Sequence, residues 1–586
     1  MRRAKIVCTL GPASSDRRTI RDLADAGMSV ARVNSSHGTL ESRASIVETV
    51  RSVDEETEFP LATMVDMQGP EVRTAPLDEP IHVETGSTVT FVAGDTATPE
   101  VVGLSCDIAG VGPGDKVLLD DGRIETTVER VDDDGVHARV DDGGELASRK
   151  GVNTPGVDLD LEVVTESDRR DLELAAEHDV DFVAASFVRD AADVFEVSEV
   201  LEDLGADVPV VAKIERAGAV ENLEEIIDAA YGVMVARGDL GVELPMEQVP
   251  MIQKRIIRRC QQTGTPVITA TEMLDSMVHE RRPTRAEASD VANAVLDGTD
   301  AVMLSGETAI GDHPVEVVKA MDRIVSQVEG DQEYDEANER RVPGADDSRT
   351  DALARSARYL ARDLGASAIV AGTESGYTAL KTAKYRPNVP IVAATNADRV
   401  RRQLALSWGV NAQYAPLGVS GADDVIEHAV QAALDADVAE SGDTVVVLSG
   451  MMTDLEGAGT TNMLKVHIAA ETLAAGRGVV SGYVSGPLHH VPDGDITDLP
   501  AGAIVALDAD FDDEFHGDVS RIGGIVDARS GMTGYPALVA REVGIPMVSG
   551  ADVVGGRAGE VVTLDAERGV VYEGEIRRPG TERAEY

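Results

Sequence analysis

A lysine and a carboxylate follow directly on a run of apolar side chains in residues 208–216, VPVVAKIER. Lys213 and Glu215 stand two positions apart, and a second apolar run, YGVMVA, leads in the same way to Asp239. Two carboxylates with open coordination positions suit a hard divalent cation, Mg²⁺ or Mn²⁺, that keeps waters and binds phosphate oxygens. These residue types therefore indicate metal-assisted chemistry on a phosphate, with Lys213 as a cation beside it.

The same residues allow other interpretations. In a chain with 105 acidic residues, Glu215 and Asp239 could be solvated loop acids. Lys213 could form a Schiff base with a carbonyl substrate, or could extend its stem along the strand end and keep its ammonium in water. A buried lysine needs a carboxylate or an anion nearby, which favours the metal site. In ARGDLGVELP, Gly238 permits close backbone approach and a helix start would bind a carboxylate, although a plain turn is the alternative.

Polar side chains also follow two earlier apolar runs. Oxygen ligands with little net charge suit a monovalent cation, and this part of the chain offers Asn34, Ser36 and Asp66. Arg32 and His37, in the same segment ARVNSSHG, could meet a nucleotide. The alternative is that Asn34 or Ser36 caps the helix expected over 40–52.

Eight apolar runs, each followed by a loop and an amphipathic helical stretch, organise the first 330 residues. They are KIVCTL, MSVARV, LATMVD, DFVAAS, VPVVAK, YGVMVA, TPVITA and DAVMLS. Eight βα units in succession predict a (β/α)8 barrel, in which the carboxyl ends of all strands face one mouth. Polar groups follow nearly every run and would meet there, among them Arg73, Ser186, Phe187, Arg189, Arg237, Thr271, Ser305 and Glu307.

The helical period is lost after the third run, where short strands alternate with Gly and Asp turns. This predicts an all-β insertion that lies at the mouth as a lid. Polar residues 331–350 end the barrel, alternating helix and strand patterns resume at 351–475, and the last block has many glycines and short Val-rich strands. We expect four parts: an α/β barrel over 1–69 and 155–340, a lid over 70–154, an open α/β domain over 345–476, and a further domain over 479–586.

The composition and net charge indicate the environment in which the protein works and the partners that are disfavoured. The chain has 586 residues and a net charge of −52. Only 27% of the residues are charged, which is ordinary, so the unusual feature is the excess of acidic over basic residues. A surface this acidic repels itself at low salt and is screened at molar salt, where the Debye length is about 3 Å. We interpret it as adaptation to a salt-rich, halophilic cytoplasm, with an ordinary acidic protein as the alternative. Nucleic-acid binding is disfavoured, because phosphate contacts need patches of Lys and Arg.

Cysteine usage and the N-terminus indicate the compartment. Cys8, Cys106 and Cys260 have no metal or disulfide spacing, which favours a reduced, intracellular chain. The first residues, MRRAKIVCTLGP, have no signal-type apolar region, and no stretch approaches 18 uninterrupted apolar residues. We expect a soluble, cytoplasmic protein without membrane partners.

With these residues assembled, the chain resembles pyruvate kinase. The matching segments are KIVCTLGPAS, ARVNSSHG, DMQGPEVRT, GVNTPG, AKIE, MVARGDLG, TATEMLDSM, RPTRAEASDVANAV and MLSGETAIGDHP. They follow in order along the barrel, and the insertion lies where that family carries its lid. SGMMTDLEGAGTTNMLKVH extends the resemblance into the second domain. The last block, with GMTGYPALVAREVGIPMVSG, is similar to the swivelling phosphohistidine domain of phosphoenolpyruvate-utilising enzymes.

The resemblance implies an enzyme that transfers the phosphoryl group of phosphoenolpyruvate to ADP in glycolysis, giving pyruvate and ATP. It implies Mg²⁺ (or Mn²⁺) and K⁺ as cofactors, a homotetramer and allosteric control. Glu215 and Asp239 would bind the divalent metal, and Lys213 would stabilise the transferring phosphoryl group and the enolate oxygen. The backbone of Gly238 and Asp239, with Thr271, would hold the substrate carboxylate and methylene. Thr271 and a water are the expected route for protonation of the enolate.

The remaining assignments concern K⁺ and the nucleotide. The resemblance implies that K⁺ is bound by Asn34, Ser36, Asp66 and the carbonyl of Met67. Arg32 and Arg73 would clamp phosphate, whereas Pro12 and His37, with Asn34 beside them, would lie against the nucleotide. Glu71 resembles the K⁺-dependent type of the family, in which a Lys at this position would otherwise supply the positive charge.

Four positions depart from the family pattern. Gln68 and Ser167 stand where Lys is common, which removes positive charge beside phosphates. In GTESGYTAL, which resembles the loop for a phosphorylated effector, Tyr377 replaces a common Arg. Tyr535 replaces the phosphocarrier His of the last domain, so we interpret that domain as structural or regulatory. The phosphate cradle would consist of Thr373, Ser375 and Thr378, with ordinary helix capping as the alternative.

Two other functions stay open at this point. One is a lyase that forms a Schiff base at Lys213, and the other is a non-catalytic, effector-binding protein on the same scaffold. The complete set of Lys213, Glu215, Asp239 and Thr271 favours the kinase.

Overall fold

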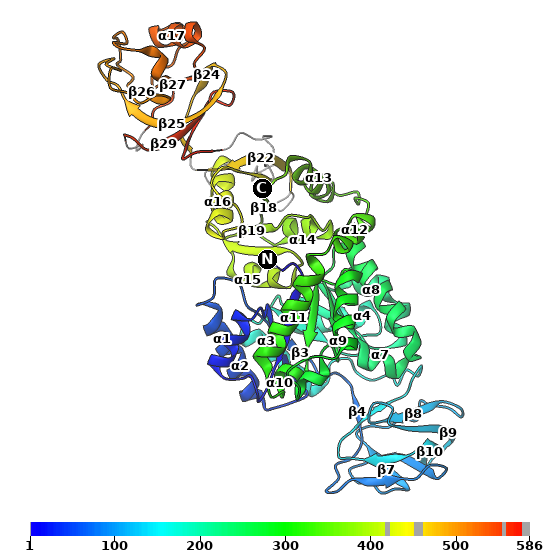
Figure 1. Cartoon of the computed structure of the whole chain (residues 1–586). Helices are drawn as coiled ribbons and strands as arrows, with labels where there is room; N and C mark the ends of the chain where they lie inside the picture. The colour runs from blue at the N-terminus through cyan, green and yellow to red at the C-terminus, as the bar shows by residue number, and fades with distance from the viewer. Residues whose placement is uncertain (1, 417–421, 451–460, 471, 554–557, 577–586) are drawn as a thin grey trace. The chain divides into compact units, whose positions relative to one another are not determined.

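The computed structural model describes residues 2–416, 422–450, 461–470, 472–553 and 558–576 (Figure 1). By contacts, the chain divides into two units. The first consists of Met1–Asp351, Thr373–Arg386 and Thr395–Tyr414. The second consists of Ala352–Gly372, Pro387–Ala394 and Ala415–Tyr586. The resemblance segment 449–467 runs through residues 451–460, which lie outside the described residues.

Eight parallel strands close into a barrel, as the apolar runs predict. Around the barrel they follow in chain order, and the last strand pairs with the first, Ala301 beside Lys5. The strands are β1 (Lys5–Leu10), β2 (Val30–Asn34), β3 (Ala62–Asp66), β13 (Phe182–Ala185), β14 (Val210–Ile214), β15 (Gly232–Ala236), β16 (Val267–Ala270) and β17 (Ala301–Leu304).

Alternation along each strand explains why continuous apolar runs form this barrel. On β1, Val7 belongs to a central cluster with Val30, Met64 and Ile268, while its neighbours Ile6 and Cys8 belong to a cluster shared with the surrounding helices. Both faces of a parallel barrel strand are therefore buried, which is why the runs are mostly apolar.

Helices surround the strands and turn each connection back to the start of the barrel (Figure 1). Among the described residues, no helix combines the length and the apolar composition needed to cross a membrane. The barrel helices and the short helices near them are α1 (Arg17–Asp25), α2 (Leu40–Asp54), α3 (Glu166–Glu177), α4 (Ala191–Asp203), α5 (Ala217–Glu221), α6 (Leu223–Ala229), α7 (Arg237–Glu243), α8 (Val249–Thr263), α9 (Arg285–Asp297), α10 (Gly306–Ala309) and α11 (Pro314–Glu329).

The inserted segment after β3 is all β, as predicted, and has an apolar core of its own that includes Val89, Phe91 and Val117. Its first strand, β4, pairs antiparallel with its last, β12, so the chain enters and leaves side by side. The strands are β4 (Val72–Arg73), β5 (Ile81–Val83), β6 (Thr88–Ala93), β7 (Val101–Leu104), β8 (Lys116–Leu119), β9 (Ile124–Asp132), β10 (Gly135–Asp142), β11 (Gly144–Leu146) and β12 (Gly151–Asn153).

A five-stranded sheet in the order β20-β19-β18-β21-β22 forms the expected α/β part. The polar segment before it is not only a connection, because it contains a helix, α12 (Gln332–Arg341). The other elements are α13 (Arg349–Leu364), β18 (Ala368–Gly372), α14 (Tyr377–Lys384), β19 (Ile391–Thr395), α15 (Asp398–Gln403), β20 (Val410–Tyr414), α16 (Ala422–Asp435), β21 (Asp443–Ser449) and β22 (Met463–Ala469).

The last part of the chain has a sheet in the order β23-β30-β29-β25-β26-β27-β28-β24. This sheet takes its first strand from Thr472, earlier than the domain start at 479 expected from the sequence. The elements are β23 (Thr472–Ala475), β24 (Arg477–Val480), β25 (Tyr483–His490), β26 (Ala503–Leu507), β27 (Ile522–Asp527), α17 (Tyr535–Val543), β28 (Met547–Ser549), β29 (Val561–Asp565) and β30 (Val570–Glu573).

Candidate active site

Lys213, near the carboxyl end of β14, is the centre of the polar cluster at the barrel mouth. Its side chain is 12% exposed. The ammonium donates to the hydroxyl of Ser186 at 2.7 Å and lies 2.8 Å from Glu215 Oε1 and 3.2 Å from Asp66 Oδ1. An ammonium has three donors, and here each has an acceptor. The alternative of a lysine that keeps its ammonium in water is therefore wrong.

The electrostatics keep Lys213 charged. Burial by itself would lower the pKa of its ammonium, but the carboxylates of Asp66, Glu215 and Asp239 outweigh burial and raise the pKa above its ordinary value. A Schiff-base lysine instead needs a lowered pKa, because the neutral amine is the nucleophile. This arrangement disfavours the lyase interpretation.

Glu215 and Asp239 are positioned by successive strands, as predicted. Glu215 is 1% exposed, and its Oε2 accepts from the backbone N–H of Phe187 at 2.6 Å. Burial first, and then the charge of Glu215, raise the pKa of Asp239 to about 7. Two carboxylates held this close disfavour the interpretation as solvated loop acids, and a cation between them would relieve their repulsion.

The donor set fits a hard divalent cation. In the part of the chain that the structure describes, no group of three or more His, Cys, Asp or Glu side chains is arranged to hold a metal ion. Mg²⁺ and Mn²⁺ do not need such a cage, because they are commonly bound through one or two carboxylates and keep waters or substrate phosphates as their other ligands.

Thr271 follows β16 and faces the start of α7, which begins at Arg237 as the sequence suggests. The N–H of Gly238 donates to Thr271 Oγ1 at 2.8 Å. Thr271 has a φ of 68°, which for a β-branched residue costs on the order of 1–3 kcal/mol. The guanidinium of Arg237 donates to the carbonyls of Ala270 at 3.0 Å and Thr271 at 2.8 Å, and so holds this strained turn in place.

Arg32 and Asp66 connect the second and third strands to the same cluster. Arg32 donates to Asp66 Oδ2 at 2.6 Å and to Thr9 Oγ1 at 2.8 Å. Burial opposes ionisation of the fully buried Asp66, but Arg32 and Lys213 together hold the pKa of its carboxyl below the ordinary value. The hydroxyl of Ser186 donates to the carbonyl of Met67 at 2.7 Å, which brings that carbonyl beside the lysine.

Of the remaining residues predicted near the cation and nucleotide, Asn34, Ser36 and His37 lie at or just after the end of β2, and Pro12 follows β1. Asn34 pairs in register with Asp66, and its Oδ1 accepts from the N–H of Ser36 at 3.2 Å. His37 and Pro12 are exposed. The alternative that Asn34 or Ser36 caps the next helix is wrong, because α2 begins after Thr39, whose hydroxyl accepts from the N–H of Ser42 in a capping box.

Glu71 and Arg73 form an ion pair where the lid begins. Arg73 donates to Glu71 Oε2 at 2.6 Å and to the carbonyl of Arg149 at 3.0 Å. Burial raises the pKa of the Glu71 carboxyl despite this partner. Of the two positions where the family commonly has Lys, Gln68 is half-buried and Ser167 is exposed on the first turn of α3.

The candidate effector loop precedes α14. Thr373 and Thr378 are buried and Ser375 is exposed. The capping alternative is wrong, because the helix is capped by Gly376, with a φ of 82°, and no side chain makes the cap hydrogen bond. In the last domain, Tyr535 is the first residue of α17, and its hydroxyl accepts from the N–H of Phe515 at 3.3 Å.

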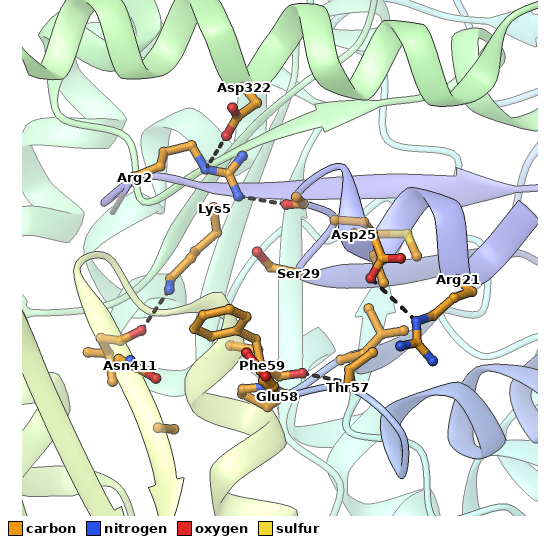
Figure 2. Close-up of a pocket in the computed structure, with 18 of the residues that line it drawn as sticks. Arg2, Lys5, Arg21, Asp25, Ser29, Thr57, Glu58, Phe59, Asp322 and Asn411 are labelled. Atoms are coloured by element: carbon orange, nitrogen blue, oxygen red, sulfur yellow. Dashed lines mark hydrogen bonds and ion pairs between the residues drawn. The ribbon is translucent and has the colours of Figure 1, made fainter. Parts of the chain in front are cut away.

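A pocket of about 630 Å³ lies at the opposite end of the barrel strands, away from this cluster. Lys5, Ser29 and Leu61, at the starts of β1, β2 and β3, are among its lining residues. Lys5 donates to the carbonyl of Val410 at 2.7 Å, and Arg2 lies 3.7 Å from Asp322, toward which Figure 2 shows it directed. The sequence gives no sign of this pocket, since its residues come from the amino ends of strands and carry no motif.

Ser186 and Phe187 were only part of the predicted row of polar strand ends, without a role. The structure makes them direct partners of Lys213 and Glu215. The available signal was their place immediately after the apolar run DFVAA, on the strand that pairs directly with the lysine strand.

Comparisons with known proteins agree with this architecture. Residues 1–318 match the family model of the pyruvate kinase barrel domain, residues 351–467 that of the pyruvate kinase alpha/beta domain, and residues 499–569 that of the mobile domain of PEP-utilising enzymes. The pyruvate kinase of Staphylococcus aureus strain MRSA252 is 41% identical over 585 residues, which cover 98% of this chain and 99% of the relative. That of Staphylococcus epidermidis strain ATCC 35984 is 40% identical with the same coverage. The chain therefore belongs to the pyruvate kinase family of enzymes.

Proposed function

We propose that this protein transfers the phosphoryl group of phosphoenolpyruvate to ADP, giving pyruvate and ATP as a step of glycolysis in the cytoplasm. The observation that carries the proposal is the buried ammonium of Lys213, held charged between Asp66 and Glu215 with Asp239 beside it. In phosphoryl transfer the protein contributes mainly positioned positive charge and forms no covalent bond itself. The ammonium of Lys213 supplies such a charge.

The divalent cation of the proposal is Mg²⁺ or Mn²⁺, bound by Glu215 and Asp239. When bound, it supplies positive charge to the oxygens of the transferring group. Lys213 contributes a second, fixed positive charge at the phosphoryl group and at the enolate oxygen. The backbone of Gly238 and Asp239 and the side chain of Thr271 hold the rest of the substrate, with Thr271 and a water as the proposed route of the proton to the enolate carbon.

For K⁺ we propose Asn34, Ser36, Asp66 and the carbonyl of Met67 as ligands. The register of β2 and β3, which pairs Asn34 with Asp66, supports this set. A ligand set with one carboxylate suits a monovalent ion.

The phosphates and the nucleotide would be bound by the remaining polar groups of the mouth. Arg32 and Arg73 contact phosphate in this proposal, while Pro12, Asn34 and His37 lie along the nucleotide. The exposure of His37 and Pro12 supports a role in contacting a ligand that enters from solvent.

Further parts of the proposal concern regulation and assembly. We propose the four-part domain division given above, a homotetramer, and an allosteric effector that carries a phosphate and binds at Thr373, Ser375 and Thr378. The last domain is structural or regulatory, because a tyrosine at position 535 cannot act as an imidazole does in carrying phosphate. The high acidity supports function in a salt-rich cytoplasm.

The test is turnover in an assay coupled to lactate dehydrogenase, with phosphoenolpyruvate, ADP, Mg²⁺ and high KCl. With the wild-type protein, the pyruvate formed should be reduced by lactate dehydrogenase with oxidation of NADH, and with Lys213→Ala the NADH should stay unoxidised. Borohydride added with substrate should leave the protein unmodified, because a kinase forms no imine. Absence of turnover in the wild type, with Lys213→Ala behaving identically, would overturn the proposal and favour a non-catalytic, effector-binding protein.

A further inference from the structure

We propose that Ser186 is a positioning residue that couples the monovalent-cation ligands to Lys213 through its hydroxyl. This inference rests on the proposed function, and it assigns a role to a residue outside the predicted ligand sets. Ser186 directly follows β13 and is 2% exposed, so its hydroxyl is directed by protein groups alone.

The hydroxyl of Ser186 contacts Lys213 and also the carbonyl of Met67, a proposed K⁺ ligand. Its oxygen accepts from the ammonium of Lys213 at 2.7 Å. Its proton goes to the carbonyl of Met67 at 2.7 Å, while Asp66 Oδ1 lies farther away at 3.4 Å. A serine hydroxyl has only one proton, so the direction of the chain is fixed, from Lys213 through Ser186 to Met67.

The direction of this chain matters because Met67 contributes its carbonyl to the proposed K⁺ site. Hydrogen bonds in series polarise one another in a low-dielectric interior. A change in the electron density of the Met67 oxygen therefore changes how strongly the Ser186 oxygen accepts the hydrogen bond from Lys213. The position of the Lys213 ammonium depends in turn on how strongly the Ser186 oxygen accepts its hydrogen bond, because Ser186 is one of the three acceptors of the ammonium.

The backbone leaves Ser186 little freedom to lose these contacts. Gly69, with a φ of 71°, approaches so closely that a Cβ there would lie 3.0 Å from the Cβ of Ser186 and 2.9 Å from the ring of Phe187. Phe187 has a φ of 57° and donates its N–H to Glu215. Ser186 and Phe187 thus contact three parts of the site from one short segment. The partners are Lys213, the proposed divalent-metal ligand Glu215 and the proposed K⁺ ligand Met67.

The competing interpretation is that Ser186 is only a satisfied polar group in a packed interior. A residue with that role affects stability, but it has no reason to affect cation affinity. The two interpretations are separated by Ser186→Ala, Ser186→Cys and a matched control, Thr126→Val. Thr126 is also fully buried and donates its hydroxyl to a carbonyl, that of Val117, at 2.8 Å, but it lies within the sheet of the lid.

The experiment combines steady-state kinetics with cation binding. Ser186→Ala should lower kcat by about 10- to 100-fold with little change in KM for phosphoenolpyruvate, as expected when a group that orients a reacting residue is lost. It should also raise the K⁺ concentration for half-maximal rate, and weaken ⁸⁶Rb⁺ binding in equilibrium dialysis without substrates, by several-fold. Ser186→Cys, which keeps a weak donor and acceptor, should recover part of each loss.

Thr126→Val should lower Tm without changing kcat or ⁸⁶Rb⁺ affinity. The proposal is overturned if Ser186→Ala shifts only Tm, or lowers kcat while ⁸⁶Rb⁺ affinity and the K⁺ requirement stay at wild-type values. Absence of turnover in the wild type would instead be a failure of the proposed function, and ⁸⁶Rb⁺ binding by the Ser186 variants would then decide the coupling alone.

Discussion

At the scale of single residues, the cluster at the mouth is held together because Arg32 and Lys213, from two strands, both pair with Asp66 from a third. Asp66 accepts from Arg32 and Lys213, and Lys213 is shared between Asp66 and Glu215. Removing one member of such a buried set leaves an unpaired charge, which costs more than the pair contributes. Variants at this site should therefore keep the shape of the side chain, and part of the loss in a neutral variant comes from the partner charge that is left unpaired.

Lys213→Met should lower kcat by about 10³-fold, because one positioned cation at the developing charge is worth that order. Mn²⁺ binding, measured by electron paramagnetic resonance without substrates, should persist because Glu215 and Asp239 remain. Lys319→Met is the control, since Lys319 is an exposed lysine paired with Glu316 on α11. A Lys213→Met enzyme with wild-type kcat would contradict the assigned role.

Glu71→Lys should reduce the dependence of turnover on K⁺. Glu71 lies at the junction of barrel and lid, where its carboxylate pairs with Arg73, and an ammonium at this position would bring a positive charge to the same region. Rates measured with and without KCl, at constant ionic strength set by tetramethylammonium chloride, test this. An unchanged K⁺ requirement would refute it.

At the scale of elements, the turns after the barrel strands determine how closely the polar groups of the cluster approach one another. Gly69→Ala should destabilise the protein by about 1–3 kcal/mol and lower kcat, because a Cβ there meets Phe187 and Ser186 and the backbone has a positive φ. Gly86→Ala is the matched control. Gly86 also has a positive φ, of 84°, but nothing lies within 4 Å of its added Cβ. Thermal unfolding and kcat should separate the two variants, and equal losses in both would contradict a specific role for the Gly69 contact.

The elements of the barrel could be predicted because each strand is apolar on both faces and is followed by a polar end. The site could be predicted only in part. Lys213, Glu215 and Asp239 were expected together, since strand order places β14 beside β15. The links through Ser186 and the N–H of Phe187 were not, because they depend on positive-φ turns at residues 187 and 69 that bring backbone groups onto side chains. Helix α12 was missed because its polar composition lacks an apolar period.

At the scale of the whole molecule, the net charge of −52 governs stability through its response to salt. Tm should rise between about 0.1 M and 3 M salt, because shorter Debye lengths screen repulsion among surface carboxylates. NaCl and KCl should raise Tm similarly, whereas turnover should require KCl. Thermal scans and coupled assays in the two salts test these two effects separately, and a Tm that falls with added salt would contradict the first.

Lys5, in the pocket of Figure 2, should make stability depend on pH. Burial, and then the neighbouring Arg2, lower the pKa of its ammonium to about 7, so above that pH the unfolded chain holds a proton that the folded chain has released. Stability therefore rises with pH between the folded and unfolded pKa values. The Tm advantage of Lys5→Met over wild type should be largest near pH 6 and shrink towards about pH 9. A difference that does not change with pH for Lys5→Met would contradict this linkage.

The pairing of β4 with β12 has a consequence for how this architecture is inherited. Val72 lies opposite Val152, so the lid joins the barrel through two neighbouring strands and its two ends need no separate anchoring. A module attached in this way can be gained, lost or exchanged between genes as one piece, while the eight barrel strands, three before it and five after it, keep their register. Selection can thus reshape the inserted β segment independently of the barrel.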